Sequence, residues 1–518
     1  MSSSEDEDSK IFIEKPVEKS TSTKSLDDLL QLRWYCVRVL LMAGLSALTS
    51  LSSNMFMVFA GANPGVIGCD THQVDNCHDL RELQNSTGCI PKLDYQFLST
   101  QVEFGYICED AKKVKNTITV QTFGVLIGAA IFGQISDNFG RRKALLIVTV
   151  GSAISSLVAA FTPDLISFMI VRMICGIFAG GLSVIQMVFM VENIPKAHRM
   201  WIQNTITWSP MLTIYPLIAY FTHDWRTLSI VISCTSLMTF LAVLTLYESP
   251  RWLVQKGKIE EARRVLIAIR EANGTYNEAF EKELDSALQF ESEMMDKQTK
   301  KKGKKYTFIH LFCTWKMIGH TLTFVTGIVC TTSIVYSLMY NMEKLSGSLY
   351  WNCAITGASR WAVNIIVSIL DFSFPQFGRK IANQISMTFT ILALFAIIAS
   401  ILEGYNGPVL TIGTFIASSM CAQLFILKYL MVNELYPTAV RNLAVSAVST
   451  MSRIGSMFSP QLFYLAEYAE WLPYAVILLF QAYDLLVFTI FIPETKGSRL
   501  KNHLPPKNER IFGNRRRN

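Results

Sequence analysis

Three positively charged side chains lie inside long apolar stretches of this 518-residue sequence. Arg360 and Arg453 each fall midway along such a stretch, and Lys428 stands six residues before Glu434. A charge at the centre of a membrane span costs about 2.5–3.5 kcal/mol on insertion scales, so such residues are functional candidates by default. Guanidinium groups form paired, charge-assisted hydrogen bonds with carboxylates and similar anions. The pattern predicts a site for an anionic group, with Arg453, Arg360 and Lys428 as substrate-binding candidates.

A structural role is the alternative for these cations. Arg360 or Lys428 could instead pair with Asp371, with Glu434 or with backbone carbonyls, and so hold helices together. Arg453 is the strongest binding candidate of the three.

Other kinds of site find little support in the sequence. The seven histidines are scattered, and neither H-E-x-x-H nor G-x-S-x-G occurs, so the chain is not expected to be an enzyme or to hold a metal. No G-x-x-x-x-G-K-[ST] loop for nucleotide phosphates is present. The net charge of +7 comes mainly from Lys and Arg in the loops, so nucleic-acid binding is not indicated. We expect no cofactor.

The apolar stretches are typical of membrane helices. The chain is 51% hydrophobic and only 17% charged, whereas soluble domains have about 25% charged residues. About 20 helical residues cross a hydrocarbon core of about 30 Å, and a helix satisfies its own backbone hydrogen bonds there. The first stretch is full length and shows no cleavage site, so no signal peptide is expected. We predict an all-α membrane protein with twelve transmembrane helices, near 35–59, 114–136, 144–162, 165–191, 201–221, 227–247, 316–340, 349–373, 381–403, 408–433, 443–466 and 471–493.

The cations of the short loops predict the orientation. In a twelve-span protein they all fall on one side: Arg141, Arg142, Lys143, Lys196, Arg199, Arg379, Lys380 and Arg441. The positive-inside rule makes that side cytoplasmic. The expected parts are a cytoplasmic tail 1–34, an N-terminal half 35–247, a cytoplasmic loop 248–315, a C-terminal half 316–493 and a cytoplasmic tail 494–518. The loop's basic run, 300–305, is expected to favour the cytoplasmic side or to contact anionic lipid.

The opposite side has one large loop, 60–113, which is expected to be extracellular. It contains four cysteines, Cys69, Cys77, Cys89 and Cys108. Two disulfides are expected there, and the sequence leaves their three possible connectivities open. Asn85 begins an N-glycosylation sequon on the same side. These features indicate the secretory pathway and the plasma membrane.

Two segments of the chain repeat one another. Gly140 and Gly378 lie 238 residues apart, each in a basic F-G-R loop between the second and third spans of its half. Two six-helix pseudo-repeats are typical of transporters that move one half against the other. The first copy, G-Q-I-S-D-N-F-G-R-R at 133–142, resembles the loop motif of the major facilitator superfamily, in which this cluster latches the cytoplasmic gate. Asp137 is expected to cap a helix and to pair with nearby arginines, and Pro375 replaces it in the second copy, so we expect a weaker second latch.

Further motifs resemble the organic cation, carnitine and organic anion transporter branch of that superfamily. They are E-S-P-R-W-L at 248–253, N-E-L-Y-P-T at 433–438, P-E-T-K-G at 493–497 and D-W-R at 224–226, together with the cysteine-bearing loop. The resemblance extends over residues 30–500 and implies the major facilitator fold. It also implies gating or structural roles for Asp137, Gly140, Arg141, Arg142, Arg172, Glu192, Glu248, Arg251, Gly378, Arg379, Glu434, Arg441 and Glu494.

The resemblance also bears on the charge of the solute. Spans 8, 10 and 11 line the central cavity in the superfamily. Arg453 falls where organic anion and carnitine transporters carry arginine and cation-selective members carry a carboxylate, and Arg360 falls where many members have an acidic residue. Span 4 shows Ser183 and Met187 where cation-selective members use aromatic residues; aromatic faces favour cations.

We therefore expect alternating-access transport of small organic ions, leaning to organic anions or to zwitterions such as carnitine-like solutes. No mid-span acid is expected to face the cavity, because Asp484 is in span 12, which is peripheral in this fold, so facilitated diffusion or exchange is favoured over proton symport. The alternatives are an organic cation transporter of the same fold and a non-transporting receptor or scaffold. The sequence does not reveal the oligomeric state.

Overall fold

The computed structural model describes most of the chain between Leu29 and Lys496. The described residues are 29, 31–69, 72–73, 80, 82, 86, 88–195, 198, 202, 208–300, 307–374, 376–404 and 407–496. Cys77, Asn85, Lys196, Arg199, Pro375, residues 301–305 and most of both tails (1–28, 30 and 497–518) lie outside them, so the expectations for these positions stay predictions.

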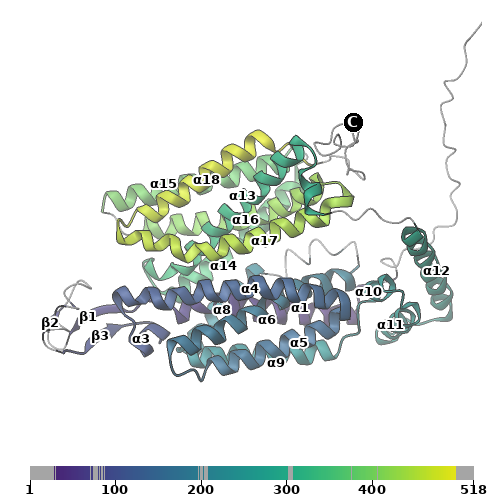
Figure 1. Cartoon of the computed structure of the whole chain (residues 1–518), viewed down its shortest axis with the longest axis horizontal. Helices are drawn as coiled ribbons and strands as arrows, with labels where there is room; N and C mark the ends of the chain where they lie inside the picture. Colours follow the sequence, from purple (N-terminus) through teal and green to yellow (C-terminus); the bar gives the residue numbers. More distant parts are fainter. Residues whose placement is uncertain are drawn as a thin grey trace, which may run out of the picture.

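Two helical bundles lie side by side, one from each half of the sequence (Figure 1). The first contains α1 (Trp34–Ala60), α4 (Ala111–Phe139), α5 (Arg141–Ala159), α6 (Leu165–Asn193), α8 (Trp208–Thr222) and α9 (Trp225–Leu244). The second contains α13 (Trp315–Tyr340), α14 (Leu349–Ser373), α15 (Arg379–Leu402), α16 (Pro408–Leu435), α17 (Thr438–Leu462) and α18 (Leu472–Phe491). These helices correspond one to one with the twelve predicted spans.

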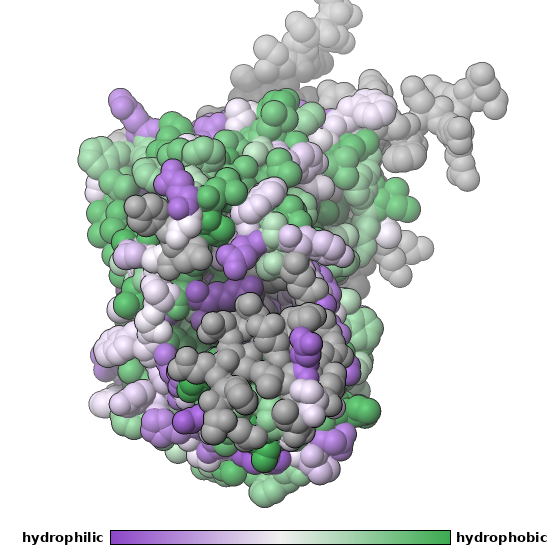
Figure 2. All heavy atoms as spheres, turned by 90° about the vertical axis from the view of Figure 1, so that its left-hand side faces the viewer, coloured by the Kyte–Doolittle hydropathy of each residue, from purple (hydrophilic) through white to green (hydrophobic). Residues whose placement is uncertain are grey.

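Ten of these helices are long and apolar enough to cross a membrane. The other two are α8, of which 15 residues are described, and α17, which carries Arg441 and Arg453. Many side chains on the outer surfaces of the bundles are large, hydrophobic and exposed, among them Phe161, Phe221 and Phe372, which are 71%, 79% and 92% exposed. Hydrophobic atoms also cover the flank of the C-terminal half in Figure 2. Such surfaces are expected of helices that face lipid rather than water.

The two ends of the molecule differ. Three further helices, α10 (Pro250–Gln255), α11 (Ile259–Ala272) and α12 (Glu278–Lys300), lie at one end, which we call the α10–α12 end (Figure 1). A small antiparallel sheet lies at the other, the sheet end, with strand order β2–β1–β3. Its strands are β1 (Gly65–Cys69), β2 (His72–Gln73) and β3 (Pro91–Asp94), and α3 (Thr100–Phe104) follows them.

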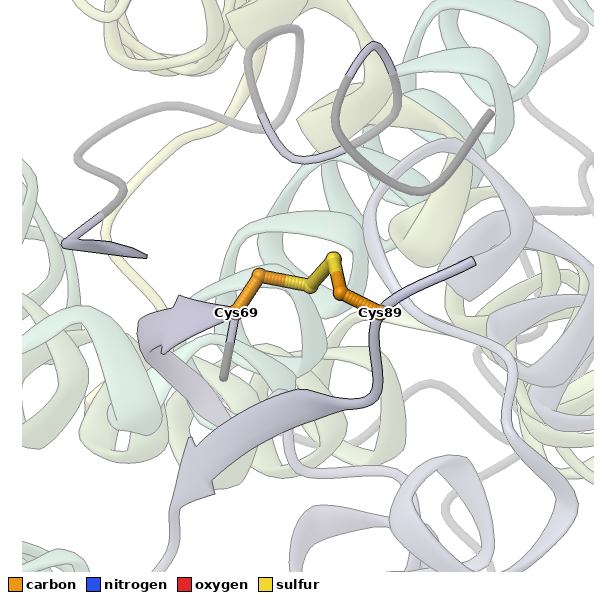
Figure 3. Close-up of a disulfide and its surroundings, with 2 residues drawn as sticks. All are labelled: Cys69 and Cys89. Atoms are coloured by element: carbon orange, nitrogen blue, oxygen red, sulfur yellow. A yellow bond between two sulfur atoms is a disulfide. The ribbon is translucent and has the colours of Figure 1, made fainter. Parts of the chain in front are cut away.

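A disulfide joins Cys69 to Cys89 at the sheet end, with the Cα atoms 5.7 Å apart (Figure 3). It links the last residue of β1 to the segment that leads into β3, and Cys69 lies opposite Pro91 in the sheet. Cys108 is also disulfide-bonded. The expected disulfides of this loop are therefore present at these three cysteines, and the pairing of Cys69 with Cys89 selects one of the three connectivities that the sequence left open.

Glycines allow α4 and α6 to pack backbone to backbone. A Cβ atom built on Gly128 would lie 1.8 Å from the carbonyl oxygen of Ile177, and one on Gly180 would lie 2.2 Å from that of Val125. Small residues at helix contacts are a common means of association in membranes, where lipid supplies no hydrophobic driving force between helices.

We expect Gly128→Ala to lower the stability of the purified protein by about 1–3 kcal/mol, because the added methyl group meets backbone that cannot rotate away. Gly133→Ala is the matched control on the same helix, since a Cβ there has no atom within 4 Å. Alanine favours helix over glycine by up to about 1 kcal/mol, so the control should melt at the same or a higher temperature. Equal melting temperatures for the two variants in detergent would contradict this packing.

Candidate functional site

Arg453 bridges the two halves at the middle of the membrane region. It lies on α17, and its Nη2 donates a hydrogen bond to the Ser183 Oγ of α6, 3.4 Å away. Gly455, two residues along α17, brings α17 close to α13, because a Cβ there would lie 2.2 Å from Thr332 Oγ1. Arg453 is thereby held by a close helix pair of one half while its side chain reaches the other half.

Arg360 lies within the second half on α14. Its Nη1 lies 3.0 Å from the Met339 sulfur of α13, a weak acceptor, and its Nε is buried without a hydrogen-bond partner among the described residues. The Tyr336 phenol is within electrostatic range. This guanidinium therefore keeps donors free for another ligand.

Neither arginine has a carboxylate partner in the part of the chain that the structure describes. The ion pairs of the membrane region involve other cations. A buried charge is normally paired or strongly hydrogen-bonded, because desolvation without compensation is costly. The two guanidinium groups have different neighbours, Ser183 of α6 for Arg453 and Met339 of α13 for Arg360, and an anionic ligand would supply the charge that each lacks.

Lys428 has a different environment from the two arginines. Its side chain is 1% exposed and forms an ion pair with Asp484 of α18, also 1% exposed. Its ammonium further donates to the Gly327 carbonyl at 2.7 Å and to Thr331 Oγ1 at 2.8 Å. Lys428 therefore does not face a solute site in this conformation. Its contacts fit the alternative, structural role, with Asp484 and the Gly327 carbonyl as partners in place of Asp371 or Glu434. Asp484 is likewise buried, although α18, which carries it, is largely exposed.

Arg172 is a further buried cation among the predicted site residues. It is 0% exposed, lies 4.2 Å from the centre of the Phe56 ring and donates to Gln121 Oε1 and to the Ser53 carbonyl at 2.8 and 2.7 Å. These contacts join α6 to α1 and α4. They favour a structural role for Arg172 within the first half.

The predicted latch residues of the first half form one cluster at the α10–α12 end. Arg141 pairs with Asp137 at 2.5 Å and with Glu192 at 3.3 Å. Glu248 caps α5 by accepting the backbone N–H groups of Arg141 and Arg142, both at 2.9 Å. The expected pairing of Asp137 with an arginine is present, but the helix cap comes from Glu248 instead. A carboxylate at a helix N-terminus also interacts favourably with the helix dipole.

Gly140 makes this cap possible. Its φ of +112° favours glycine, and a Cβ would lie 2.5 Å from Glu248 Oε2. Arg142 donates its Nη2 to the Leu244 carbonyl at 3.0 Å, and Arg251 lies exposed at the start of α10.

The second half repeats this cluster. Glu494 caps α15 by accepting the N–H groups of Arg379 and Lys380 at 2.9 and 3.0 Å. The Arg379 side chain bonds to Glu434 at 3.2 Å and forms an ion pair with Asp371. Asp371 supplies the carboxylate that Pro375 lacks, so the expectation of a weaker second cluster finds no support in its geometry.

Two further residues complete this second cluster. A Cβ on Gly378 would lie 2.1 Å from Glu494 Oε2, which parallels the contact of Gly140 with Glu248. Arg441 donates its Nε to the Tyr436 carbonyl at 3.3 Å.

Contacts between the halves gather at the sheet end. Lys115 of α4 pairs with Glu343 of η5 (Met342–Lys344) at 2.7 Å, with side chains only 14% and 9% exposed. Glu343 also accepts the Asn63 N–H at 2.9 Å. The Tyr350 hydroxyl donates to the Gln96 carbonyl at 2.9 Å, and the Tyr464 hydroxyl lies 2.9 Å from Asn116 Oδ1.

The surface of the sheet end is polar where the two halves meet. Figure 2 shows hydrophilic side chains gathered near the middle of this face. The halves are thus fastened together at the sheet end, whereas the clusters of Arg141 and Arg379 each lie within one half.

This fold and site define a membrane transporter. The family described as "Sugar (and other) transporter" matches residues 86–503. The inward-open xylose transporter XylE from E. coli has the same fold, with a TM-score of 0.63 at 19% identity over 90% of this chain and 98% of XylE.

Two similar proteins indicate the branch of this transporter family. Solute carrier family 22 member 6 of Pseudopleuronectes americanus is 30% identical over 400 residues, 76% of this chain and 69% of that protein. Human organic cation/carnitine transporter 2 is 28% identical over 432 residues, 82% of this chain and 74% of that protein. The chain belongs to the major facilitator superfamily, in its organic cation, carnitine and organic anion transporter branch.

Sequence reasoning missed several ion pairs, among them Lys115–Glu343 and Lys428–Asp484. Lys115 and Glu343 lie at helix ends, where charged residues are common, so nothing in their spacing distinguished them. Asp484 did give a signal, because an acid inside an apolar stretch calls for a buried partner. Pairing the one acid of span 12 with the one lysine of span 10 would have found the contact.

Proposed function

We propose that this protein carries small organic anions or zwitterions across a membrane by alternating access. The observation that carries the proposal is the pair of guanidinium groups, Arg453 and Arg360, that have no carboxylate partner among the described residues. A carboxylate or sulfonate supplies the missing charge and matches the fork of guanidinium donors. The names of the relatives, which include organic cation/carnitine transporters, agree with a small organic ion as solute.

The two ends of the molecule support the alternating-access part of the proposal. The sheet end is closed by Lys115–Glu343 and its neighbouring hydrogen bonds, whereas the Arg141 and Arg379 clusters each lie within one half. We assign the sheet end to the extracellular side and the α10–α12 end to the cytoplasm, which fits a disulfide at the former. On this assignment the described conformation is closed at the extracellular side, and the plasma membrane is the proposed location.

The transport cycle follows from these placements. The solute's negative group binds Arg453 with help from Arg360. Closing the cytoplasmic side brings the Arg141 and Arg379 clusters of the two halves together, while the Lys115–Glu343 contact separates at the other side. Because Asp484 is buried against Lys428, the described residues offer no free mid-span acid for proton symport, so we propose facilitated diffusion or exchange.

Uptake by purified protein in liposomes tests this proposal. The panel contains labelled organic anions, carnitine-like zwitterions and organic cations of matched size, each measured with empty and with solute-preloaded vesicles. Uptake of anions or zwitterions is expected, and faster uptake after preloading would indicate exchange. Uptake of cations alone would refute the solute assignment. Binding without accumulation of any solute would instead favour a receptor.

A further inference from the structure

The ion pair of Lys428 and Asp484 is held by several further contacts, although neither residue contacts the proposed solute. It joins α16 to α18, and the ammonium reaches α13 through Gly327 and Thr331. Gly327 leaves the necessary space, because a Cβ there would lie 2.3 Å from Asp484 Oδ1 and 2.9 Å from Lys428 Nζ. All three ammonium hydrogens have acceptors, whereas Asp484 Oδ1 accepts no hydrogen bond from the described residues. Lys428 is thus the principal partner of this carboxylate.

The pair lies close to the proposed solute site. The Cys421 thiol is within electrostatic range of Arg360, Lys428 and Asp484 together. Cys421 and Lys428 are two turns apart on one face of α16, about 10 Å along the axis. Ser419, also on α16, bonds to Ser359, the neighbour of Arg360, at 2.8 Å. The ammonium and the Arg360 guanidinium therefore act on the same region.

The pair determines how many positive charges of the second half remain uncompensated. The membrane-embedded part of the second half contains three buried or half-buried cations, Arg360, Lys428 and Arg453, whereas Asp484 is the acid at that depth among the described residues. Asp484 neutralises one cation and leaves two for the solute. Without it, the uncompensated charge of Lys428 would strengthen the attraction of each negative charge of the solute. For a separation on the order of 10 Å and an intermediate effective dielectric, the gain is about tenfold.

We propose that Asp484 and Lys428 set the charge that the solute site accepts: the intact pair holds the site to monoanions and zwitterions and disfavours dianions. This inference rests on the proposed function and deepens it. Asp484 and Lys428 are positioning residues, because they act through the field at Arg360 rather than by touching the solute.

The test compares initial uptake rates of a monocarboxylate and a dicarboxylate of matched size in liposomes. Asp484→Asn should raise the ratio of dianion to monoanion kcat/KM about tenfold, because the dianion feels the freed charge twice. Lys428→Gln should lower that ratio. Asp484→Asn combined with Lys428→Gln is the matched control, and it should return the ratio to that of the unaltered protein. A merely structural pair would lower both rates together and leave the ratio unchanged in every variant, which would overturn the inference.

The experiment also distinguishes failure of this inference from misfolding of a variant and from failure of the proposed function. If Asp484→Asn does not fold, Lys428→Gln and the double variant still decide the sign of the ratio change. If the unaltered protein transports only cations, the proposed function fails, yet the inference still predicts slower cation uptake in Asp484→Asn and its recovery in the double variant. Unchanged cation uptake in Asp484→Asn would refute the inference on its own.

Discussion

Arg453→Asp is expected to abolish uptake of organic anions and zwitterions in liposomes, a loss of at least about 100-fold in kcat/KM. Removing one partner of a desolvated, hydrogen-bonded charge pair costs about 2–5 kcal/mol, and the new carboxylate adds repulsion. Arg453 carries this effect because its contact with Ser183 places it between the halves, where a solute must be held in both open states.

Two variants separate charge from packing in this prediction. Arg453→Lys keeps the charge but loses the guanidinium fork, so an intermediate loss is expected. Ser183→Ala removes the hydroxyl that Arg453 contacts but no charge, so its effect should be within about threefold, corresponding to a weak hydrogen bond. Equal losses in Arg453→Asp and Ser183→Ala would mean that the contact between the halves matters rather than the anion site.

Glu343→Gln is expected to shift the protein toward opening at the sheet end by about 30-fold. The Lys115–Glu343 pair is nearly buried and joins the two halves, and the loss of such a charge-assisted contact costs about 2 kcal/mol. Spin labels at Lys113 and Tyr468, exposed positions at the sheet end of opposite halves, report the separation in a background without free cysteines. The population at the longer distance should increase.

The matched control is Glu403→Gln, which removes an exposed carboxylate at the same end and should leave the distances unchanged. Exchanging the charges, with Lys115→Glu and Glu343→Lys together, should restore much of the closed population. An unchanged distance distribution in Glu343→Gln would show that the other contacts of this end suffice, and that the ion pair does not gate.

The helices and the repeat were predictable because they depend on local sequence. Each apolar stretch satisfies its own backbone, so its length and position suffice to place a span such as α15. The Gly140 loop was predictable for the same reason: a positive φ and a close carboxylate select glycine at one position. The expected cluster of Arg141 with Asp137 is local as well, since the two residues are one turn apart.

The remaining features depend on which helices become neighbours. Asp371 stands in for a carboxylate at position 375 because the end of α14 brings it to Arg379, and sequence alignment of the two repeats does not show this. Lys428 and Asp484 are 56 residues apart and meet only because α13, α16 and α18 pack together. A charge inside an apolar stretch therefore predicts that a partner exists, but the choice between a protein partner and a solute needs the packing.

The central claim is that a positively charged site between the halves selects an organic anion or zwitterion. The ratio of anion to cation uptake, measured for size-matched labelled solutes in one liposome preparation, tests it most directly in the unaltered protein and in Arg453→Asp. We predict a ratio well above one in the unaltered protein and a collapse of that ratio in the variant. A ratio below one in the unaltered protein, unchanged by Arg453→Asp, would contradict the account.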